Sequence, residues 1–364
     1  MFVHAGSAAE RGWAKRWGAG LAIAFGLVGC SGDDAGVSVL KTGTQVDSPV
    51  VVATTSVICD LTQQIAETTV ALTCLLDPGT DPHTYQVKPS DRQAIEQADL
   101  ILYDGYGASP NLISMVENST GEARRLAVYE QAVPTPLMGA DHDHDHDHGA
   151  EAIHVDGTAH DDDDDKNHAH SATADADLVP DPHIWHSATH NAAMVAVIAE
   201  TLAEINPDQA TLYTENADRI AAQFAEIDGW IQTQVATVPA DQRQLVTTHD
   251  SFGYFAEAYG FEVKGALSGL STDEKPTPGA LTALVDQVKA TQVPAIFAEN
   301  TTNPQLIEAV AKDAGVTVAE QPLFVEGPGG PSSAAETVQA MLVANTCAVV
   351  EALGGSCDRA SAPL

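Results

Sequence analysis

Short apolar segments alternate with amphipathic segments along most of the chain. Residues 50–54 are apolar and β-branched, which predicts a strand, and residues 57–66 have the spacing of a helix. A capping-box pattern, Ser-Asp-Arg-Gln at residues 90–93, predicts another helix start. Further predicted strands are residues 70–76, 100–103, 244–248, 262–267, 295–299 and 316–320, and further predicted helices are residues 252–259, 278–290, 304–314 and 334–353. This alternation predicts an α/β protein with two parallel-sheet lobes.

A long amphipathic segment separates the two predicted lobes. Residues 207–238 have no proline after Pro207, which suits the first position of a helix. One helix of this length would measure roughly 45 Å, which is too long for one small lobe. We therefore expect a linking helix along both lobes. The remaining boundaries are a first lobe at residues 49–206, a second lobe at residues 239–357 and a tail at residues 358–364.

The N-terminus has the pattern of a secretory leader. Basic residues precede an apolar run at residues 18–29, which is too short to span a bilayer. The run ends in Leu-Val-Gly-Cys, which resembles the bacterial lipobox and predicts lipidation of Cys30. An ordinary signal peptide followed by a stray cysteine is the alternative. We expect a leader at residues 1–29, a flexible tether at residues 30–48 and a protein anchored outside the cytoplasm, periplasmic or at the cell surface.

The other cysteines fit an oxidising compartment. Without Cys30 they number four, namely Cys59, Cys74, Cys347 and Cys357. Four cysteines allow three pairings, of which the local pairs Cys59–Cys74 and Cys347–Cys357 are the simplest. Thiolate ligation of zinc is the rival interpretation, but the sequence has no Cys-x-x-Cys pair.

The charge of the chain is strongly acidic, and much of it lies in one segment. Lys+Arg 16 against Asp+Glu 51 gives a net charge of −35, which argues against nucleic-acid binding and favours attraction of cations. Residues 139–177 have almost no large apolar residue, so we expect a disordered insertion. Its alternating Asp and His residues predict accessory metal donors at His142, His144, His146 and His148. An inert acidic linker is the alternative.

Three distant histidines lie in similar local settings. His83 and His183 each end an Asp-Pro-His motif, and His249 ends the predicted strand 244–248. Ligands of α/β sheets bind at the carboxyl ends of strands, and Glu326 lies in a Gly/Pro-rich loop beyond another strand. Three imidazoles and one carboxylate suit tetrahedral zinc. A lone loop histidine more often has a surface or capping role, but three in matching positions predict one metal site.

The motifs around these histidines resemble those of one family. Asp-Pro-His-Thr-Tyr-Gln at residues 81–86, Asp-Pro-His-Ile-Trp at residues 181–185 and His-Asp-Ser-Phe-Gly-Tyr-Phe at residues 249–255 are similar to the ligand motifs of cluster A-I proteins. These are the metal-binding substrate-binding proteins of bacterial ABC transporters, the zinc/manganese receptors. The resemblance extends over residues 49–353 and includes the acidic His-rich insertion. It implies two α/β lobes joined by a long helix, with the metal in the cleft.

Two departures from the family pattern bear on the site. The fourth ligand of the family is usually an Asp in a Leu-x-x-Asp-Ser setting, whereas here Glu326 stands at the comparable place, followed by Gly327. A longer carboxylate can still bind a metal. After the second motif the family commonly continues with a small or apolar residue and Pro, but here His186 follows, with His190 nearby. Each is either an accessory ligand or a surface residue at a helix start.

The resemblance implies a receptor that captures Zn²⁺ and delivers it to an ABC permease in the membrane. Manganese receptors of the family tend to have Glu in place of the third His, so His249 favours zinc, with Mn²⁺ as the alternative. We expect a monomer and no enzyme activity. Alternatives from other classes are a secreted zinc hydrolase, a metal buffer and an adhesin. The chain has neither a His-Glu-x-x-His motif nor a Walker-type phosphate-binding loop.

Overall fold

A computed structural model describes residues 48–140, 178–273 and 275–364. The predicted leader, the lipidation site Cys30, the tether and most of the His-rich insertion, including its four histidines, lie outside these residues. No helix within the described ranges is both long enough and apolar enough to cross a membrane.

The first half of the chain builds a four-stranded parallel sheet. Its strands are β1 (Val50–Ala53), β2 (Ala71–Cys74), β3 (Leu100–Tyr103) and β4 (Arg124–Ala127), and they lie in the order β2-β1-β3-β4. The associated helices are α1 (Ser56–Ala66), α2 (Pro89–Gln97), α3 (Pro110–Glu117) and α4 (Val128–Ala132). β1 and β3 are buried almost throughout, because helices cover both faces of a parallel sheet.

The second half repeats this strand order. β7 (Gln244–His249) pairs in parallel with β8 (Glu262–Ser268), and β9 (Ala295–Ile296) pairs in parallel with β10 (Thr317–Val318). The amide of Phe297 donates to the carbonyl of Val246 at 2.9 Å, which places β9 beside β7 and gives the order β8-β7-β9-β10. The associated helices are α7 (Gly253–Tyr259), α8 (Pro278–Thr291), α9 (Gln305–Ala314) and α10 (Val338–Ala352). The predicted fold class, two parallel-sheet α/β lobes, is confirmed.

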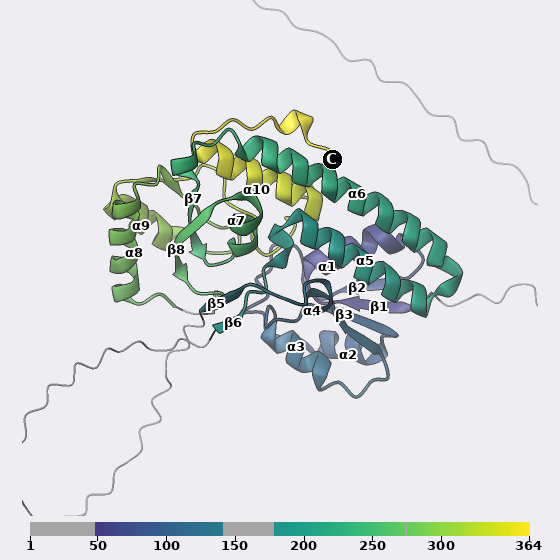
Figure 1. The fold of residues 1–364 in the computed structure, drawn as a ribbon. Helices are drawn as coiled ribbons and strands as arrows, with labels where there is room; N and C mark the ends of the chain where they lie inside the picture. Colours follow the sequence, from purple (N-terminus) through teal and green to yellow (C-terminus); the bar gives the residue numbers. More distant parts are fainter. Residues whose placement is uncertain (1–47, 141–177, 274) are drawn as a thin grey trace, which may run out of the picture. The chain divides into compact units, whose positions relative to one another are not determined.

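A long helix contacts elements of both halves. The predicted helix 207–238 consists of a 3₁₀ turn, η2 (Pro207–Gln209), and then α6 (Ala210–Val235) of 26 residues. α6 packs against α1 and against α5 (Ala188–Ile205) from the first half, and against α7 and α10 from the second half (Figure 1). One hydrophobic cluster includes buried side chains from all of these helices. The linking helix therefore shares its core with both halves.

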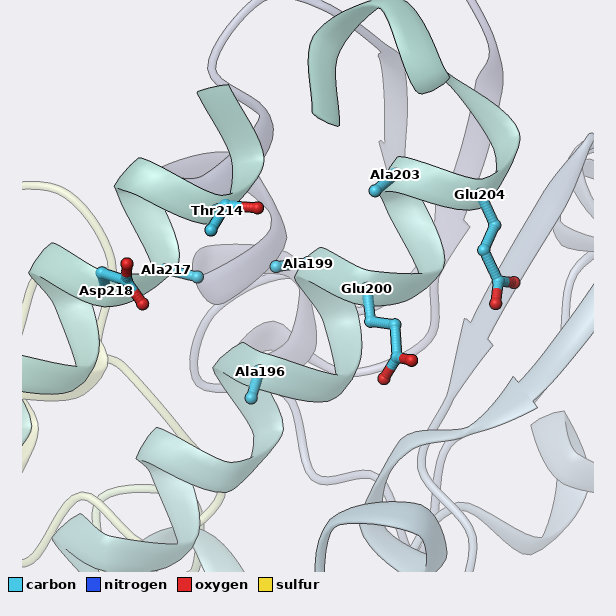
Figure 2. A pocket seen from close by; sticks show the side chains of 8 residues that line it. All are labelled: Ala196, Ala199, Glu200, Ala203, Glu204, Thr214, Ala217 and Asp218. Atoms are coloured by element: carbon cyan, nitrogen blue, oxygen red, sulfur yellow. The ribbon is translucent and has the colours of Figure 1, made fainter. Parts of the chain in front are cut away.

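Small side chains allow α5 and α6 to lie close together. Figure 2 shows a pocket between these two helices, lined by alanines such as Ala199 and Ala217 and bordered by acidic side chains such as Glu200 and Asp218. The residues that line this pocket include none of the four candidate metal ligands. The groove is thus a feature of helix packing, separate from the metal centre.

A short hairpin borders the undescribed insertion. β5 (Met138–Ala140) and β6 (Leu178–Pro180) pair in an antiparallel arrangement on either side of residues 141–177. The amide of Asp181, directly after β6, donates to the carbonyl of Leu137 at 2.8 Å. The second Asp-Pro-His motif therefore begins where this hairpin ends.

Two disulfides join the cysteines in the local pairing. Cys59 on α1 bonds Cys74 on β2, with Cα atoms 5.6 Å apart, and Cys347 on α10 bonds Cys357 of the tail, with Cα atoms 5.2 Å apart. In the chain-entropy description, closing a loop of the first kind contributes about 3 kcal/mol. The simplest pairing predicted from the sequence is confirmed.

Two helices begin with a different cap or at a different residue from the predicted one. The capping box predicted at residues 90–93 is wrong, because α2 begins at Pro89 and the side chain of Asp91 accepts from the backbone amide of Lys88 at 2.8 Å. Proline at the first helical position fixes a helical φ and moves the start toward the N-terminus. The last helix begins at Val338 rather than at residue 334, because the Thr337 hydroxyl caps it.

Candidate metal centre

Four buried side chains meet between the two halves of the protein. His83 lies in the loop after β2, and His183 lies between β6 and α5. His249 is the last residue of β7, and Glu326 lies in the loop that follows β10. One ligand atom from each of the four lies within 4.8 Å of the ligand atoms of the others, and all four residues are buried. The structure thus brings together all the predicted ligands of the cleft.

Four of the separations between donor atoms are close to those of a four-coordinate metal site. The Nε2 atoms of His83 and His249 lie 3.3 and 3.2 Å from Nε2 of His183. Oε1 of Glu326 lies 3.4 Å from Nε2 of His249 and 3.8 Å from Nε2 of His83. Donors placed about 2.0–2.1 Å from a central zinc ion are separated by about 3.3 Å along the edges of a tetrahedron. The cluster therefore has the size that a small four-coordinate cation requires.

In both Asp-Pro-His motifs the Asp side chain bonds the backbone of the His. Oδ1 of Asp81 accepts from the backbone amide of His83 at 2.9 Å, and Oδ1 of Asp181 does the same for His183 at 2.9 Å. A short Asp side chain that bonds the backbone two residues later closes a local turn. Each motif is therefore a turn that presents its imidazole at a fixed angle.

Carboxylates also bond the far sides of two imidazole rings. Nδ1 of His183 lies 2.8 Å from Oδ1 of Asp181, and Nδ1 of His249 lies 2.8 Å from Oε2 of Glu299. An ionised carboxylate can only accept a hydrogen bond, so Nδ1 carries the proton in both rings. Nε2 of each ring faces the cluster, and it can bind a metal once it carries no proton, which is the arrangement expected of a metal ligand.

Glu326 is held in the cluster through its backbone. Trp185 in the second motif donates its indole Nε1–H to the carbonyl of Val325 at 2.7 Å, and the hydroxyl of Ser56 donates to the carbonyl of Glu326 at 3.4 Å. Both carboxylate oxygens of Glu326 are buried without a hydrogen bond. Buried polar groups without such bonds are costly, and a bound cation would compensate this one.

Burial and mutual charge shift the pKa values of the cluster in opposite directions. Burial lowers the pKa of His83 and His183 well below the usual value, and the positive charge of neighbouring imidazoles lowers it further. Burial also opposes ionisation of His249, but the charges of Glu299 and Glu326 prevail and raise its pKa to about 9. Burial raises the pKa of Glu326 to about 8, although His249 opposes this shift.

These shifts predict that metal binding releases protons. At pH 7 the pKa values of about 9 for His249 and about 8 for Glu326 leave protons on the metal-free site. The metal needs both ligands unprotonated, so affinity should fall as pH falls from 8 to 6, by about tenfold per pH unit for each proton released. Calorimetric titration in buffers of different ionisation enthalpy measures the number of protons released. Identical binding enthalpies in all buffers would contradict the prediction.

Two histidines near the cluster do not belong to it. His186 is fully buried and stacks on Phe252, with ring centroids 4.3 Å apart. His190 is half-buried in the first turn of α5, and its backbone amide bonds the hydroxyl of Ser187, the N-cap. The expected surface role of His186 is therefore wrong, because the ring is part of the aromatic core. Neither residue is in the four-atom cluster.

Glu299 is the residue of the site that the sequence interpretation missed. It follows β9, as His249 ends β7, so the rule that places ligands at the carboxyl ends of strands also applies to it. The sequence interpretation treated residues 295–299 only as a strand. A carboxylate at the end of an apolar strand was the available signal.

Residues 51–352 match the family described as zinc-uptake complex component A, periplasmic. The manganese-binding lipoprotein MntA of Halalkalibacterium halodurans is 29% identical and covers 92% of this chain and 96% of its own length. MntA of Bacillus subtilis is 30% identical over 90% of this chain and 95% of its own. The solved structure of the periplasmic zinc-binding protein TroA from Treponema pallidum has a TM-score of 0.70 and 27% identity, and covers 84% of this chain and 99% of that chain.

Two α/β lobes with a buried cluster of candidate metal ligands between them, together with the family match, define a metal-binding receptor of the ABC-transporter class. The chain belongs to the periplasmic zinc-uptake component A family. The resemblance stated from the sequence motifs and the expected location outside the cytoplasm are confirmed, and the protein is a receptor rather than an enzyme.

Proposed function

We propose that this protein is a zinc receptor that binds Zn²⁺ through His83, His183, His249 and Glu326. The observation that carries the proposal is the set of three imidazole nitrogens and one carboxylate oxygen, all buried and within 4.8 Å of one another. A nitrogen-rich set of four donors suits zinc, whereas oxygen-rich octahedral sets suit manganese. The alternative is a manganese receptor, because the named relatives include proteins described as binding either metal.

A hydrolytic role is disfavoured by the donor count. Catalytic zinc sites use three protein ligands and keep a fourth position open for water. Glu326 would fill that position in this site, since its Oε1 lies 3.4 Å from Nε2 of His249 and 3.8 Å from Nε2 of His83. A closed set of four protein donors is suited to holding and transferring an ion, so metal capture is the better proposal.

The rest of the proposed function concerns delivery of the ion. We infer that Cys30 carries a lipid that tethers the protein to the membrane, and that the loaded receptor docks on an ABC permease. Residues 49–206 and 239–357 would form the two lobes that enclose the ion, with residues 207–238 linking them. A buffer or adhesin without a permease is the alternative, and it predicts no loss of zinc uptake when this chain is deleted.

The His-rich insertion should add weak sites only. We expect a variant lacking residues 141–177 to retain one tight zinc site, because β5 and β6 remain and all four cleft ligands are outside the deletion. His142, His144, His146 and His148 would then account for weaker, exchangeable binding that the deletion removes. Zinc titration of both proteins measures this, and loss of the tight site on deletion would overturn this division.

The test of metal identity is a competition between two ions. Zn²⁺ and Mn²⁺ should be titrated into the 141–177 deletion variant, each in competition with a chelator of known affinity. A clear preference for zinc at a stoichiometry of one supports the proposal. A preference for manganese at the same site would establish the alternative.

A further inference from the structure

One pair of residues, Glu299 and Asn300, bonds one candidate ligand of the second lobe and the segment that carries the other. Glu299 has a fully buried side chain and accepts two hydrogen bonds from His249. Oε1 accepts from the backbone amide and Oε2 accepts from ring Nδ1, each at 2.8 Å. The carboxylate thus spans the backbone and the side chain of the same ligand. The ring cannot turn without breaking the hydrogen bond at Nδ1, and the bond to the backbone amide holds the carboxylate in place for it.

The neighbouring residue holds the segment that carries the other ligand. The backbone amide of Asn300 donates to the carbonyl of Leu323 at 3.0 Å, and its side-chain Oδ1 accepts from the amide of Val325 at 3.4 Å. Glu299 forms an isolated parallel bridge with Leu323. These contacts end one residue before Glu326. The dipeptide at 299–300 is therefore bonded to His249 on one side and to the Glu326 segment on the other.

The two bonds to Glu299 decide which nitrogen of His249 faces the cluster. A neutral imidazole carries one proton, and a carboxylate at Nδ1 keeps that proton on Nδ1. Nε2 then has a free lone pair directed toward His183, whose Nε2 lies 3.2 Å away. The negative charge behind the ring also makes Nε2 a stronger donor to a cation.

We propose that Glu299 is a positioning residue that fixes the orientation and tautomer of His249, and that Asn300 ties the Glu326 segment to the same anchor. The two ligands of the second lobe then approach the ion as one preorganised unit. This inference rests on the proposed function, since it assigns Glu299 a role through a ligand of the proposed site. A merely structural role for Glu299 is the alternative, and it predicts effects on stability alone.

The replacement Glu299→Gln tests the proposal because it keeps the size of the side chain. His249 presents two donors to Glu299, but a carboxamide offers one acceptor oxygen and one donor group. Either the backbone amide loses its partner, or the ring moves its proton to Nε2 and cannot bind through that atom. We expect zinc affinity to fall about 10- to 100-fold. Glu299→Asp retains two acceptor oxygens and should lose less affinity.

The matched control is Glu308→Gln, an exposed carboxylate on α9 of the same lobe. Zinc affinity by chelator competition and the unfolding temperature of the metal-free protein should be measured for each variant. Wild-type affinity in Glu299→Gln would overturn the proposal. The proposal would also be overturned if Glu299→Gln and Glu299→Asp lost the same amount of zinc affinity while their metal-free forms were destabilised to the same degree. Affinity would then follow stability and not the hydrogen bonds to His249.

A spectroscopic measurement separates the role of Glu299 from general destabilisation. In the zinc-loaded wild-type protein with ¹⁵N-labelled histidine, His249 should show a slowly exchanging Nδ1–H and a metal-bound Nε2. A metal-bound Nδ1 in the wild type would overturn the proposal, even if Glu299→Gln does not fold. Failure of the proposed function gives a different result, because the wild type and Glu308→Gln would then both lack the tight zinc site.

Discussion

Replacement of His249 with alanine should remove tight zinc binding and leave the protein folded. The imidazole is one of four donors, and complete four-ligand sites contribute about 10–16 kcal/mol of binding free energy. Loss of one donor should therefore cost about 3 kcal/mol, or at least a hundredfold in affinity. Competition with a chelator in the 141–177 deletion variant measures the change without the accessory histidines.

The control for this variant is His190→Ala. His190 lies in the same region but outside the four-atom cluster, so its removal should leave zinc affinity within a fewfold of the wild type. Circular dichroism of both variants shows whether the fold is retained. A tight site that persists in His249→Ala would contradict the assignment of the metal centre.

The second large effect should come from Glu326→Gln, and it should have opposite signs in the two states of the protein. The amide keeps the size of the side chain but removes the only charged donor of the cluster. Zinc affinity should fall by about two orders of magnitude, comparable to the loss of a ligand. The metal-free protein should instead become more stable, because a buried carboxylate without hydrogen bonds is removed.

The pH dependence of this stabilisation follows from the raised pKa of Glu326. Burial raises the folded-state pKa from 4.5 to about 8, so the ionised form is disfavoured in the fold. Below pH 4.5 both states hold the proton and the variant gains nothing. Between pH 4.5 and 8 the advantage of Gln should grow, reaching about 3 kcal/mol near pH 7. Chemical unfolding of metal-free proteins at pH 4.5 and 7 measures it.

A destabilised metal-free Glu326→Gln protein would contradict this account. It would mean that Glu326 is a structural partner of His249 rather than a buried group whose ionisation is costly until an ion binds. Unchanged zinc affinity in the same variant would remove Glu326 from the ligand set. The two measurements therefore test the ligand role and the electrostatic argument separately.

Local sequence rules predicted the parts of the site that depend on short segments. Each Asp-Pro-His motif closes its own turn through Asp81 or Asp181, so the placement of the imidazole is encoded within three residues. The predicted strand 244–248 ends beside His249 because apolar, β-branched residues stop at a polar one. The disulfide pairs lie close in sequence, and pairing them locally needed no knowledge of the tertiary fold.

Features that depend on tertiary contacts could not be predicted in this way. β9 is only two residues long, and the residues that follow it bond His249 and the Glu326 segment instead of extending the sheet. The burial of His186 depends on stacking with Phe252, which is distant in sequence. No local pattern distinguishes a histidine that packs against an aromatic ring from one that faces solvent.

The proposed site holds a single zinc ion on these four side chains. A crystal structure of the zinc-loaded protein, with anomalous diffraction recorded at the zinc absorption edge, can test this. We expect one strong peak bounded by Nε2 of His83, His183 and His249 and by a carboxylate oxygen of Glu326, each about 2.0–2.2 Å from the ion. A peak at another place, or an ion that binds without Glu326 and keeps a water in its position, would contradict it.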